Sequence, residues 1–359
     1  MADAQSTRAA LGAAPAQVFA AGSPRVLVAG ATGFAGALAA HLLWRHPRFE
    51  LVAVTGRSEL GRRLDDLYPR YRVPLQIEQL DLDAVAPLDA AVVAYPHAAA
   101  APAVAALRDR GARVVDLSAD FRLASLATYE RWYGRHPQPA LLAEAVYGLT
   151  ELHRDAIAGA GIVANPGCYP TASLLGLAPL ARAGLIADVV IDAKQGISGA
   201  GRTFDETTHQ SMAGENILAY KVAEHRHTPE IEEQLQPLRA AAGSRDQLAV
   251  LFQAHLVPLD QGELADCYVT TTRRVEDSEL AELFAAAYAH EPFVEVLGAP
   301  PGTRDVLETN FCRVFAKADP HSGKVVVLSA IDNLWKGTSS QAVQNLNVMF
   351  GLPETEGLT

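Results

Sequence analysis

The sequence predicts an α/β protein in two parts, a doubly wound parallel sheet followed by an α+β part with a mixed or antiparallel sheet. From residue 25 to about 165, short apolar strands alternate with helical runs, which is the order of a parallel sheet with helices on both faces. Beyond residue 166 the strands are longer and several alternate apolar with polar residues, as in a sheet covered on one face. A length of 359 residues leaves room for two separate cores.

The expected elements follow from these patterns. In the first part we expect strands at 26–29, 50–55, 90–94, 112–117 and 161–164, with helices at 36–44 and 99–110. In the second part we expect strands at 188–194, 248–258, 264–273, 311–318 and 324–331, with helices at 173–180, 229–241, 278–290 and 339–350. The predicted organisation is an extension (1–24), a nucleotide-binding domain (25–165), a catalytic and oligomerisation domain (166–330) and a C-terminal segment (331–359) that returns to the first domain.

Composition narrows the classes of partner. The chain has 41 acidic and 30 basic residues and a net charge of −11, which argues against a nucleic-acid or anionic-membrane partner. No apolar stretch reaches membrane-spanning length. The three cysteines are far apart and show no metal-site spacing, so we expect no bound metal. Unpaired cysteines also fit a reducing compartment, and we expect a cytoplasmic location. The Ala-rich extension 1–24 lacks a signal-peptide core, and import into an organelle through it stays open.

A glycine-rich turn follows the first strand and opens a helix, which is the context of a Rossmann-type dinucleotide site. Gly30 is expected to allow the tight turn, Gly33 to let a pyrophosphate approach the backbone, and Gly36 to let the helix pack closely on the strand. The phosphates would rest on the helix N-terminus. The residues expected to bind cofactor here are Gly30, Thr32, Gly33, Phe34, Ala35 and Gly36.

The end of the second strand indicates which cofactor binds. An NAD site places a carboxylate there for the ribose hydroxyl, whereas this chain has Arg57 and Ser58, which suit the 2′-phosphate of NADP(H). Pro96 follows the 90–94 strand, where a third loop would flank the cofactor. Short-chain dehydrogenases share this kind of turn but use a Tyr-x-x-x-Lys pair, and none of the ten tyrosines here has a lysine four residues later.

Cys168 is the candidate nucleophile. It lies in Asn-Pro-Gly-Cys-Tyr-Pro-Thr, between the 161–164 strand and the 173–180 helix, where Pro166 and Gly167 force a bend. The helix dipole is expected to stabilise a thiolate near neutral pH, and such a thiolate can attack an acyl carbon. Cys267 and Cys312 lie in strand-like runs and are expected to be core residues.

The same chemistry needs a proton shuttle and an anion-binding group. His225 and His227 lie at i and i+2, on one face of an extended segment that precedes a helix, and no third metal ligand with suitable spacing stands near them. Ser118, Arg122 and Arg202 follow strands or flexible loops and are candidates to bind phosphate or carboxylate.

Six motifs, in this order, resemble the N-acetyl-gamma-glutamyl-phosphate reductase family of arginine biosynthesis: Gly-Ala-Thr-Gly-Phe-Ala-Gly, Ser-Ala-Asp-Phe-Arg, Asn-Pro-Gly-Cys-Tyr-Pro-Thr, Ser-Gly-Ala-Gly-Arg, His-Arg-His-Thr-Pro-Glu-Ile and Asp-Asn-Leu-Trp-Lys-Gly-Thr. The resemblance runs from about residue 25 to 358 and implies a fold like that of glyceraldehyde-3-phosphate dehydrogenase. It implies that Cys168 forms an acyl enzyme and that His225 is the acid/base. It also implies cofactor contacts from Ser198, Gly199 and Asn333, and substrate contacts from Asn165 and His227.

The implied partners are an acyl phosphate, inorganic phosphate and further copies of the chain in a homodimer or homotetramer. Two alternatives stay open at this point. A lysine-pathway homologue would reduce an aminoadipyl phosphate held on a carrier protein. A non-catalytic NADP-binding regulator would use Cys168 as a redox switch, but it would leave His225, Arg122 and Arg202 unexplained.

Overall fold

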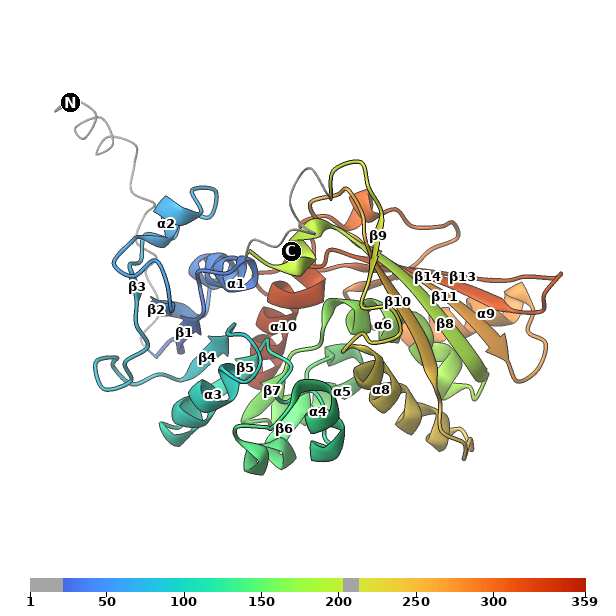
Figure 1. The fold of residues 1–359 in the computed structure, drawn as a ribbon, viewed down its shortest axis with the longest axis horizontal. Helices are drawn as coiled ribbons and strands as arrows, with labels where there is room; N and C mark the ends of the chain where they lie inside the picture. The colour runs from blue at the N-terminus through green and yellow to red at the C-terminus, as the bar shows by residue number, and fades with distance from the viewer. Residues whose placement is uncertain (1–21, 203–212) are drawn as a thin grey trace.

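Two seven-stranded sheets lie at the two ends of the chain's long axis, the first built from residues before Cys168 and the second from residues after it (Figure 1). The computed structural model describes residues 22–202 and 213–359. The expected extension over 1–24 therefore lies, apart from its last three residues, outside the described part. Within the described ranges no helix combines the length and apolar character needed to cross a membrane.

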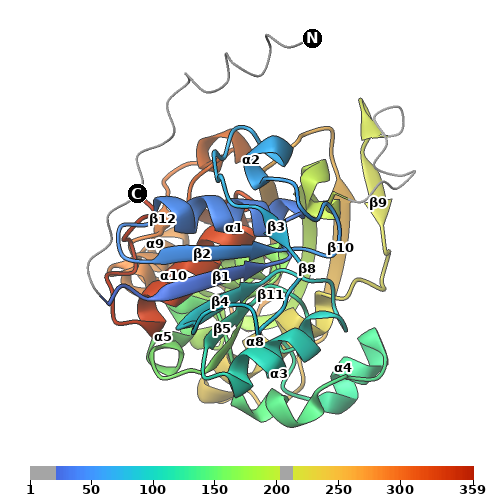
Figure 2. The same cartoon turned by 90° about the vertical axis from the view of Figure 1, so that its left-hand side faces the viewer.

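The first sheet is entirely parallel, in the order β3-β2-β1-β4-β5-β7-β6, and confirms the doubly wound prediction. Its strands are β1 (Arg25–Ala29), β2 (Glu50–Thr55), β3 (Ile77–Glu78), β4 (Ala90–Val93), β5 (Arg113–Asp116), β6 (Ala145–Tyr147) and β7 (Ile162–Ala164). The helices of this part are α1 (Phe34–Arg45), α2 (Leu64–Leu67), α3 (Ala100–Asp109), α4 (Leu126–Tyr133), the 3-10 helix η2 (Pro139–Glu144) and α5 (Thr150–Ala158). The central strands are almost wholly buried because α1 covers one face and α3 the other (Figure 2).

The second sheet is mixed, in the order β12-β13-β14-β11-β8-β10-β9, as the alternating strands predict. Its strands are β8 (Ile186–Gln195), β9 (Leu218–Tyr220), β10 (Val250–Leu256), β11 (Glu263–Thr271), β12 (Val294–Val296), β13 (Cys312–Ala318) and β14 (Val325–Ile331). The other elements are α6 (Cys168–Arg182), η3 (Ile197–Ala200), α8 (Thr228–Ala241), α9 (Asp277–Tyr288) and η5 (Thr303–Val306). Alternate residues of β8, β10 and β11 pack beneath α6, α8 and α9 in one core that contains Cys267 and Cys312.

Two differences from the predicted elements have local causes. Helix α6 begins at Cys168, five residues before the predicted start, because Gly167 is its N-cap and Pro170 fits within its first turn. The short strands β3, β6, β9 and β12 and the helices α2, α4 and α5 were not predicted. Strands of two or three residues contain too few positions for an alternating pattern to appear.

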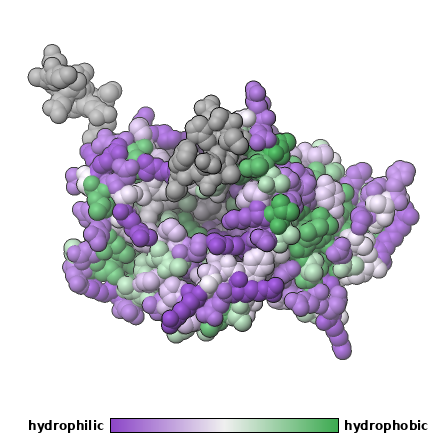
Figure 3. All heavy atoms as spheres, in the orientation of Figure 1, coloured by the Kyte–Doolittle hydropathy of each residue, from purple (hydrophilic) through white to green (hydrophobic). Residues whose placement is uncertain are grey.

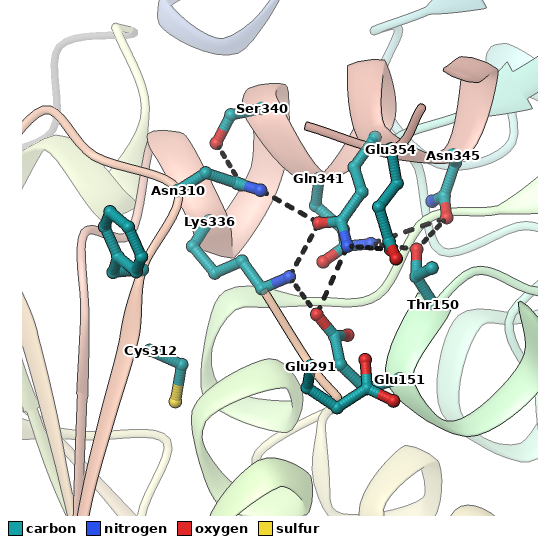
Figure 4. A network of polar contacts seen from close by, with 12 residues as sticks. Thr150, Glu151, Glu291, Asn310, Cys312, Lys336, Ser340, Gln341, Asn345 and Glu354 are labelled. Carbon is teal, nitrogen blue, oxygen red and sulfur yellow. Dashed lines mark hydrogen bonds and ion pairs between the residues drawn. The ribbon is translucent and has the colours of Figure 1, made fainter. Parts of the chain in front are cut away.

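The C-terminal segment packs against the first sheet as the π-helical turn η6 (Trp335–Ser339) and the helix α10 (Ser340–Met349). A buried polar network ties it to α5 (Figure 4). Lys336 Nζ donates to Glu151 Oε1 at 2.6 Å and to Gln344 Oε1 at 2.8 Å, and both members of the Lys336–Glu151 ion pair are fully buried. Burial alone would raise the pKa of Glu151, but the Lys336 ammonium outweighs it and lowers that pKa.

Candidate active site

Cys168 is the first residue of α6 and follows β7, so it lies at the carboxyl edge of the first sheet, the same edge as the glycine turn after β1. Its side chain is partly exposed. Gly337 of η6 approaches it so closely that a Cβ added there would lie 2.8 Å from Cys168 Cβ. The nucleophile therefore sits where the first sheet, α6 and the returning C-terminal segment meet.

The turn that carries Cys168 is held by the buried carboxylate of Glu230, from the first turn of α8. Glu230 Oε1 accepts the backbone N–H of Gly167 at 2.9 Å and the hydroxyl of Tyr147 at 2.8 Å. Its second oxygen lies 3.4 Å from Arg122 Nη1. The N–H group of Gly167 is thus bonded to a carboxylate from another element.

A chain of polar side chains leads away from the thiol. Cys168 Sγ donates to Gln195 Oε1 at 3.2 Å, and Gln195 Nε2 lies 3.3 Å from the hydroxyl of Tyr220. The Tyr220 hydroxyl donates to that of Tyr169 at 3.2 Å. Gly199 packs directly on Gln195, since a Cβ there would lie 2.3 Å from Gln195 Nε2. The loop with Ser198 and Gly199 thus borders the nucleophile in this structure.

The electrostatic surroundings of Cys168 correct the expectation of a stable thiolate. Burial raises the pKa of the thiol well above its usual range, and the carboxylate of Glu263 raises it further. Arg122 acts in the opposite direction but does not reverse the shift. The helix N-terminus therefore does not by itself ionise Cys168 in the free protein, and a nearby group has to take the proton when the sulfur attacks.

The two histidines lie together, although the segment that carries them is a turn running into α8 rather than the extended segment expected. Their ring centroids are 4.8 Å apart, and the His225 ring also packs edge-on against Tyr169 and Phe252. His225 Nδ1 accepts the backbone N–H of His227 at 3.2 Å, so the neutral ring carries its proton on Nε2. Burial, with Lys221 and Arg226, lowers the pKa of His225 to about 3.

His227 lies over the Cys168 turn. A Cβ added to Gly167 would lie 2.5 Å from His227 Nε2 and 2.9 Å from Arg122 Nη1, so only glycine fits there. His227 Nδ1 is buried and has no hydrogen-bond partner in the part of the chain that the structure describes, and burial lowers the pKa of this ring well below its usual value. Both histidines are accordingly neutral near pH 7, with one ring nitrogen that donates a hydrogen bond and one that accepts.

Six of the twelve residues predicted to bind cofactor line a cleft of about 670 Å³ beside the glycine turn. It is lined by Gly30, Thr32, Gly33, Arg57, Ser58, Ala94, Tyr95, Pro96 and Arg202. Gly30 has a φ of +90°, and a Cβ there would lie 2.5 Å from the carbonyl oxygen of Ala94. A Cβ on Gly36 would lie 2.2 Å from the carbonyl oxygen of Gly30, so helix and turn pack as expected. Gly33 has no atom closer than 3.8 Å to such a position and leaves its backbone open to a phosphate.

Phe34 and Ala35 do not line this cleft. Phe34 begins α1, and the carbonyl oxygen of Ala35 accepts the hydroxyl of Ser339 at 2.8 Å, which joins the glycine turn to η6. Arg57 also lines an adjoining cavity of about 430 Å³ with Gly56, Leu60, Gln79, Leu80, Tyr95 and Ala99. Among the residues that the structure describes, no carboxylate lines either cavity. The residues present therefore fit a dinucleotide whose adenosine end carries an extra phosphate.

Several predicted ligand residues are engaged with the protein itself. Arg122 is buried and donates to the carbonyl oxygens of Asn165 and Leu117, both at 2.8 Å. Ser118 donates to Asp116 Oδ2 at 2.6 Å. Burial raises the pKa of Asp116 to about 7. These two predicted residues shape the turn after β5 and leave little hydrogen-bonding capacity for a substrate.

The predicted amide ligands are likewise occupied. Asn165 Nδ2 donates to the carbonyl oxygen of Thr338 at 3.0 Å, and Asn165 Oδ1 accepts from Asn345 at 3.0 Å. Asn333 links two loops, since its Oδ1 accepts the Gly262 N–H at 2.9 Å and its Nδ2 donates to Ser198 Oγ at 3.1 Å.

Arg202, expected to bind substrate, lies at the cofactor cleft. Its guanidinium donates to the carbonyl oxygen of Thr32 at 3.1 Å and to Glu59 Oε1 at 3.3 Å. The structure therefore groups Arg202 with the nucleotide turn and Arg57 rather than with Cys168 and the histidines.

Three residues that sequence reasoning missed surround the nucleophile: Gln195, Glu230 and Glu263. Glu230 could have been found from the Thr-Pro-Glu start of α8, because an acidic residue in the first turn of a helix can bond to a neighbouring element as well as favour the helix dipole. Glu263 carried a weaker signal, a lone carboxylate at an inward position of an alternating strand. Gln195 carried none, because only the pairing of β8 with β11 places it under α6.

Comparisons with known proteins agree with this geometry. Residues 25–160 match the family described as semialdehyde dehydrogenase, NAD binding domain, and residues 168–333 match semialdehyde dehydrogenase, dimerisation domain. The aspartate semialdehyde dehydrogenase II of Vibrio cholerae, complexed with ASA, has a similar fold, with a TM-score of 0.69 at 17% identity over 92% of this chain and 98% of that one. The enzyme of Candida albicans, solved with NADP, gives a TM-score of 0.67 at 14% identity over 91% and 98%.

Sequence relatives are much nearer. The chain is 49% identical to the N-acetyl-gamma-glutamyl-phosphate reductase of Desulforudis audaxviator, over 93% of this chain and 97% of the relative. It is 48% identical to that of Moorella thermoacetica, over 92% and 96%, and 42% identical to that of Geobacillus stearothermophilus, over 93% and 97%. With the two domain matches, these relatives show that the chain belongs to the N-acetyl-gamma-glutamyl-phosphate reductase family of the semialdehyde dehydrogenases.

Proposed function

We propose that the protein reduces N-acetyl-L-glutamyl 5-phosphate to N-acetyl-L-glutamate 5-semialdehyde and inorganic phosphate, a step of arginine biosynthesis, with NADPH. The observation that carries this proposal is the position of Cys168 at the carboxyl edge of the first sheet, shared with the glycine cleft, in a chain of this family. A thiol so placed can form a thioester beside a dinucleotide.

The chain's own residues supply the acid–base steps. The Cys168 sulfur attacks the acyl carbon, a C–S bond forms, and the C–O bond to phosphate breaks. The neutral His225 ring carries a proton on Nε2 that it can share with the oxyanion of the tetrahedral species. Bound NADPH would supply the hydride that reduces the acyl carbon to the level of an aldehyde. Glu230 and His227 hold and cover the turn that carries the sulfur.

Binding roles are part of the proposal. The glycine turn, with Arg57, Ser58 and Pro96, would hold NADP(H), with the 2′-phosphate near Arg57. Arg202 lies near enough to the glycine turn to bind a cofactor phosphate. Residues 25–165 would act as the nucleotide-binding domain and 166–330 as the catalytic and oligomerisation domain, with 331–359 bracing the first. A cytoplasmic location is proposed because the reaction requires a free Cys168 thiol, and all three cysteines are free in the structure.

The test is the reverse reaction. Purified protein with N-acetylglutamate semialdehyde, inorganic phosphate and NADP should produce NADPH, and omission of phosphate should abolish the signal. Cys168→Ala should lose turnover yet bind NADPH as wild type does, because the glycine turn is untouched. The aminoadipate analogue, one carbon longer, should react far more slowly. Full activity of Cys168→Ala, or a preference for the longer substrate, would contradict the proposal.

We also propose that the open face of the second sheet joins two copies of the chain. The side chains of Leu251, Val190, Tyr268 and Val326 form one cross-strand row over β10, β8, β11 and β14. They point away from α6, and Leu251 and Tyr268 are 56% and 39% exposed. Figure 3 shows apolar side chains exposed among polar ones on this half of the molecule. An apolar row of this kind favours a self-complementary interface.

Sedimentation analysis tests the interface. The wild-type protein should sediment as a dimer or a tetramer, and Leu251→Glu with Tyr268→Glu should shift it toward the monomer. A double variant that keeps the wild-type assembly would mean that the copies meet elsewhere.

A further inference from the structure

Glu263 is the first residue of β11, and its carboxylate is buried without compensation. The side chain is 0% exposed, and neither carboxylate oxygen has a hydrogen-bond partner among the described residues. Among residues 22–202 and 213–359 no ion pair reaches it. Burying an unpaired carboxylate costs folding free energy. A carboxylate that is buried in this way beside a reactive group therefore indicates a function.

The register of the sheet points this carboxylate at the nucleophile. Glu263 is the cross-strand partner of Gln195, the residue whose Oε1 accepts the Cys168 thiol proton at 3.2 Å. It shares the face of β11 that carries Ala265, Cys267 and Val269, which packs against α6. Gln195 and Glu263 thus lie side by side on neighbouring strands beneath the first residue of α6, and the Glu263 carboxylate is close enough to the thiol to raise its pKa.

We propose, building on the function proposed above, that Glu263 is the proton acceptor for the Cys168 thiol. The thiol proton passes from Sγ to a carboxylate oxygen of Glu263, the S–H bond breaks and an O–H bond forms, and the charge moves from oxygen to sulfur. The thiolate then forms the C–S bond as the acyl–phosphate bond breaks. When the thiohemiacetal collapses and the C–S bond breaks, Glu263 returns the proton to sulfur, so the cycle balances.

The other groups near the thiol are less suited to this role. His227 lies over the turn, but burial lowers the pKa of its ring well below the usual value, so it is a weaker proton acceptor than Glu263. Gln195 accepts a hydrogen bond but cannot hold a proton. His225 Nδ1 is already occupied by the His227 N–H, which leaves an Nε2–H that donates. Asp332 also faces Glu263 from the end of β14, but it accepts backbone N–H groups of Glu308, Leu334 and Trp335.

The charged surroundings define the expected pH dependence. Burial raises the pKa of Glu263 to about 8, the Asp332 charge adds to the increase, and contact with Cys168 opposes it. The Glu263 charge in turn raises the pKa of Cys168, on which Arg122 acts in the opposite direction. Turnover limited by acylation should therefore increase with pH through about 8, as Glu263 becomes able to accept a proton.

The test compares two rates in Glu263→Gln. Turnover with N-acetylglutamate semialdehyde should fall roughly a hundredfold or more, because the proton acceptor is gone. Alkylation of Cys168 by iodoacetamide, measured against pH without substrate, should move the other way. Its midpoint should fall by about one pH unit or more, because a negative neighbour has been removed. Glu282→Gln, the same change at an exposed position on α9, should alter neither rate.

A merely structural role would slow turnover and alkylation together, and that result overturns the proposal, as does unchanged turnover in Glu263→Gln. If Glu263→Gln does not fold, the pH profiles of turnover for the wild type and for Glu263→Asp test the proposal instead. The wild-type turnover must rise with pH near 8, and the Glu263→Asp protein must show the same rise with a lower turnover. Alkylation needs no substrate, so a wild-type protein inactive on N-acetylglutamate semialdehyde would contradict the proposed function while the alkylation shift still tests the Glu263–Cys168 coupling.

Discussion

Glu230 Oε1 accepts the backbone N–H of Gly167 at 2.9 Å, so a carboxylate at the start of α8 fixes the residue that precedes the nucleophile at the start of α6. The two helices come from segments 63 residues apart. The same carboxylate neutralises the buried Arg122, whose other nitrogens bind the carbonyl oxygens of Asn165 and Leu117. One side chain thus couples the first sheet, the catalytic helix and the histidine turn.

We predict that Glu230→Ala lowers kcat at least tenfold and destabilises the fold by about 3–5 kcal/mol, since it leaves the Arg122 charge buried and unpaired. Glu230→Gln keeps an acceptor for the Gly167 N–H and should retain more activity while still losing stability. Urea unfolding measures the loss of stability, and the rate at which iodoacetamide alkylates Cys168 measures the change at the nucleophile. A Glu230→Ala protein as stable and as active as wild type would contradict this role.

Cofactor preference should follow Arg57, which lines both cavities beside the glycine turn. Arg57→Asp should raise the KM for NADP roughly ten- to hundredfold, the size of one lost charge-assisted hydrogen bond, and change the KM for NAD little. Arg48→Asp, an exposed arginine before β2, is the matched charge change. An unchanged ratio of the two KM values in Arg57→Asp would place the 2′-phosphate elsewhere.

The sequence predicted those parts of the site whose neighbours are local. Gly30, Gly36 and Cys168 each lie within a few residues of the strand and helix that define their conformation, so spacing alone predicts their roles. Glu263 and Gln195 become neighbours only through the β8–β11 pairing, 68 residues apart, which no local pattern encodes. The acidity of Cys168 was predicted wrongly for the same reason, because the helix dipole is local whereas burial and the Glu263 charge are tertiary.

The two histidines should differ in their effects. His225→Asn should lower kcat by about a hundred- to ten-thousandfold, because the Nε2–H donor is lost, while Cys168 still acylates and the thioester is visible by mass spectrometry. His227→Asn should be milder. Since the pKa of His225 is lowered to about 3, the kcat profile should show no limb near pH 6.5. A limb there, or a larger loss in His227→Asn, would assign the proton transfer to another ring.

The network around Lys336 should govern stability rather than chemistry (Figure 4). Lys336→Met leaves Glu151 as a fully buried unpaired carboxylate and should cost about 3–5 kcal/mol in urea unfolding. Lys317→Met, which breaks the exposed pair with Asp277 at 3.2 Å, should cost less than about 1 kcal/mol. Equal losses of stability in the two variants would show that leaving the buried Glu151 carboxylate unpaired carries no additional cost.

Glu263 should also appear in the pH dependence of stability. The pKa of Glu263 is about 8 in the folded chain, whereas the ordinary value of 4.5 applies in the unfolded chain. Between pH 4.5 and pH 8 the unfolded chain has therefore released a proton that the folded chain still holds. Unfolding then becomes easier as pH rises from about 4.5 to 8, and the effect levels off above 8. At 1.36 kcal/mol for each unit the loss is at most about 5 kcal/mol.

Glu263→Gln has no such proton to hold, so its stability relative to wild type should increase between pH 5 and pH 8.5. The comparison cancels Asp116, whose pKa burial raises to about 7, since both proteins contain it. Urea unfolding at the two pH values measures the difference. If the two proteins keep the same gap at both pH values, Glu263 is ionised in the folded chain throughout this range, and the limb near pH 8 expected for turnover cannot come from this carboxyl group.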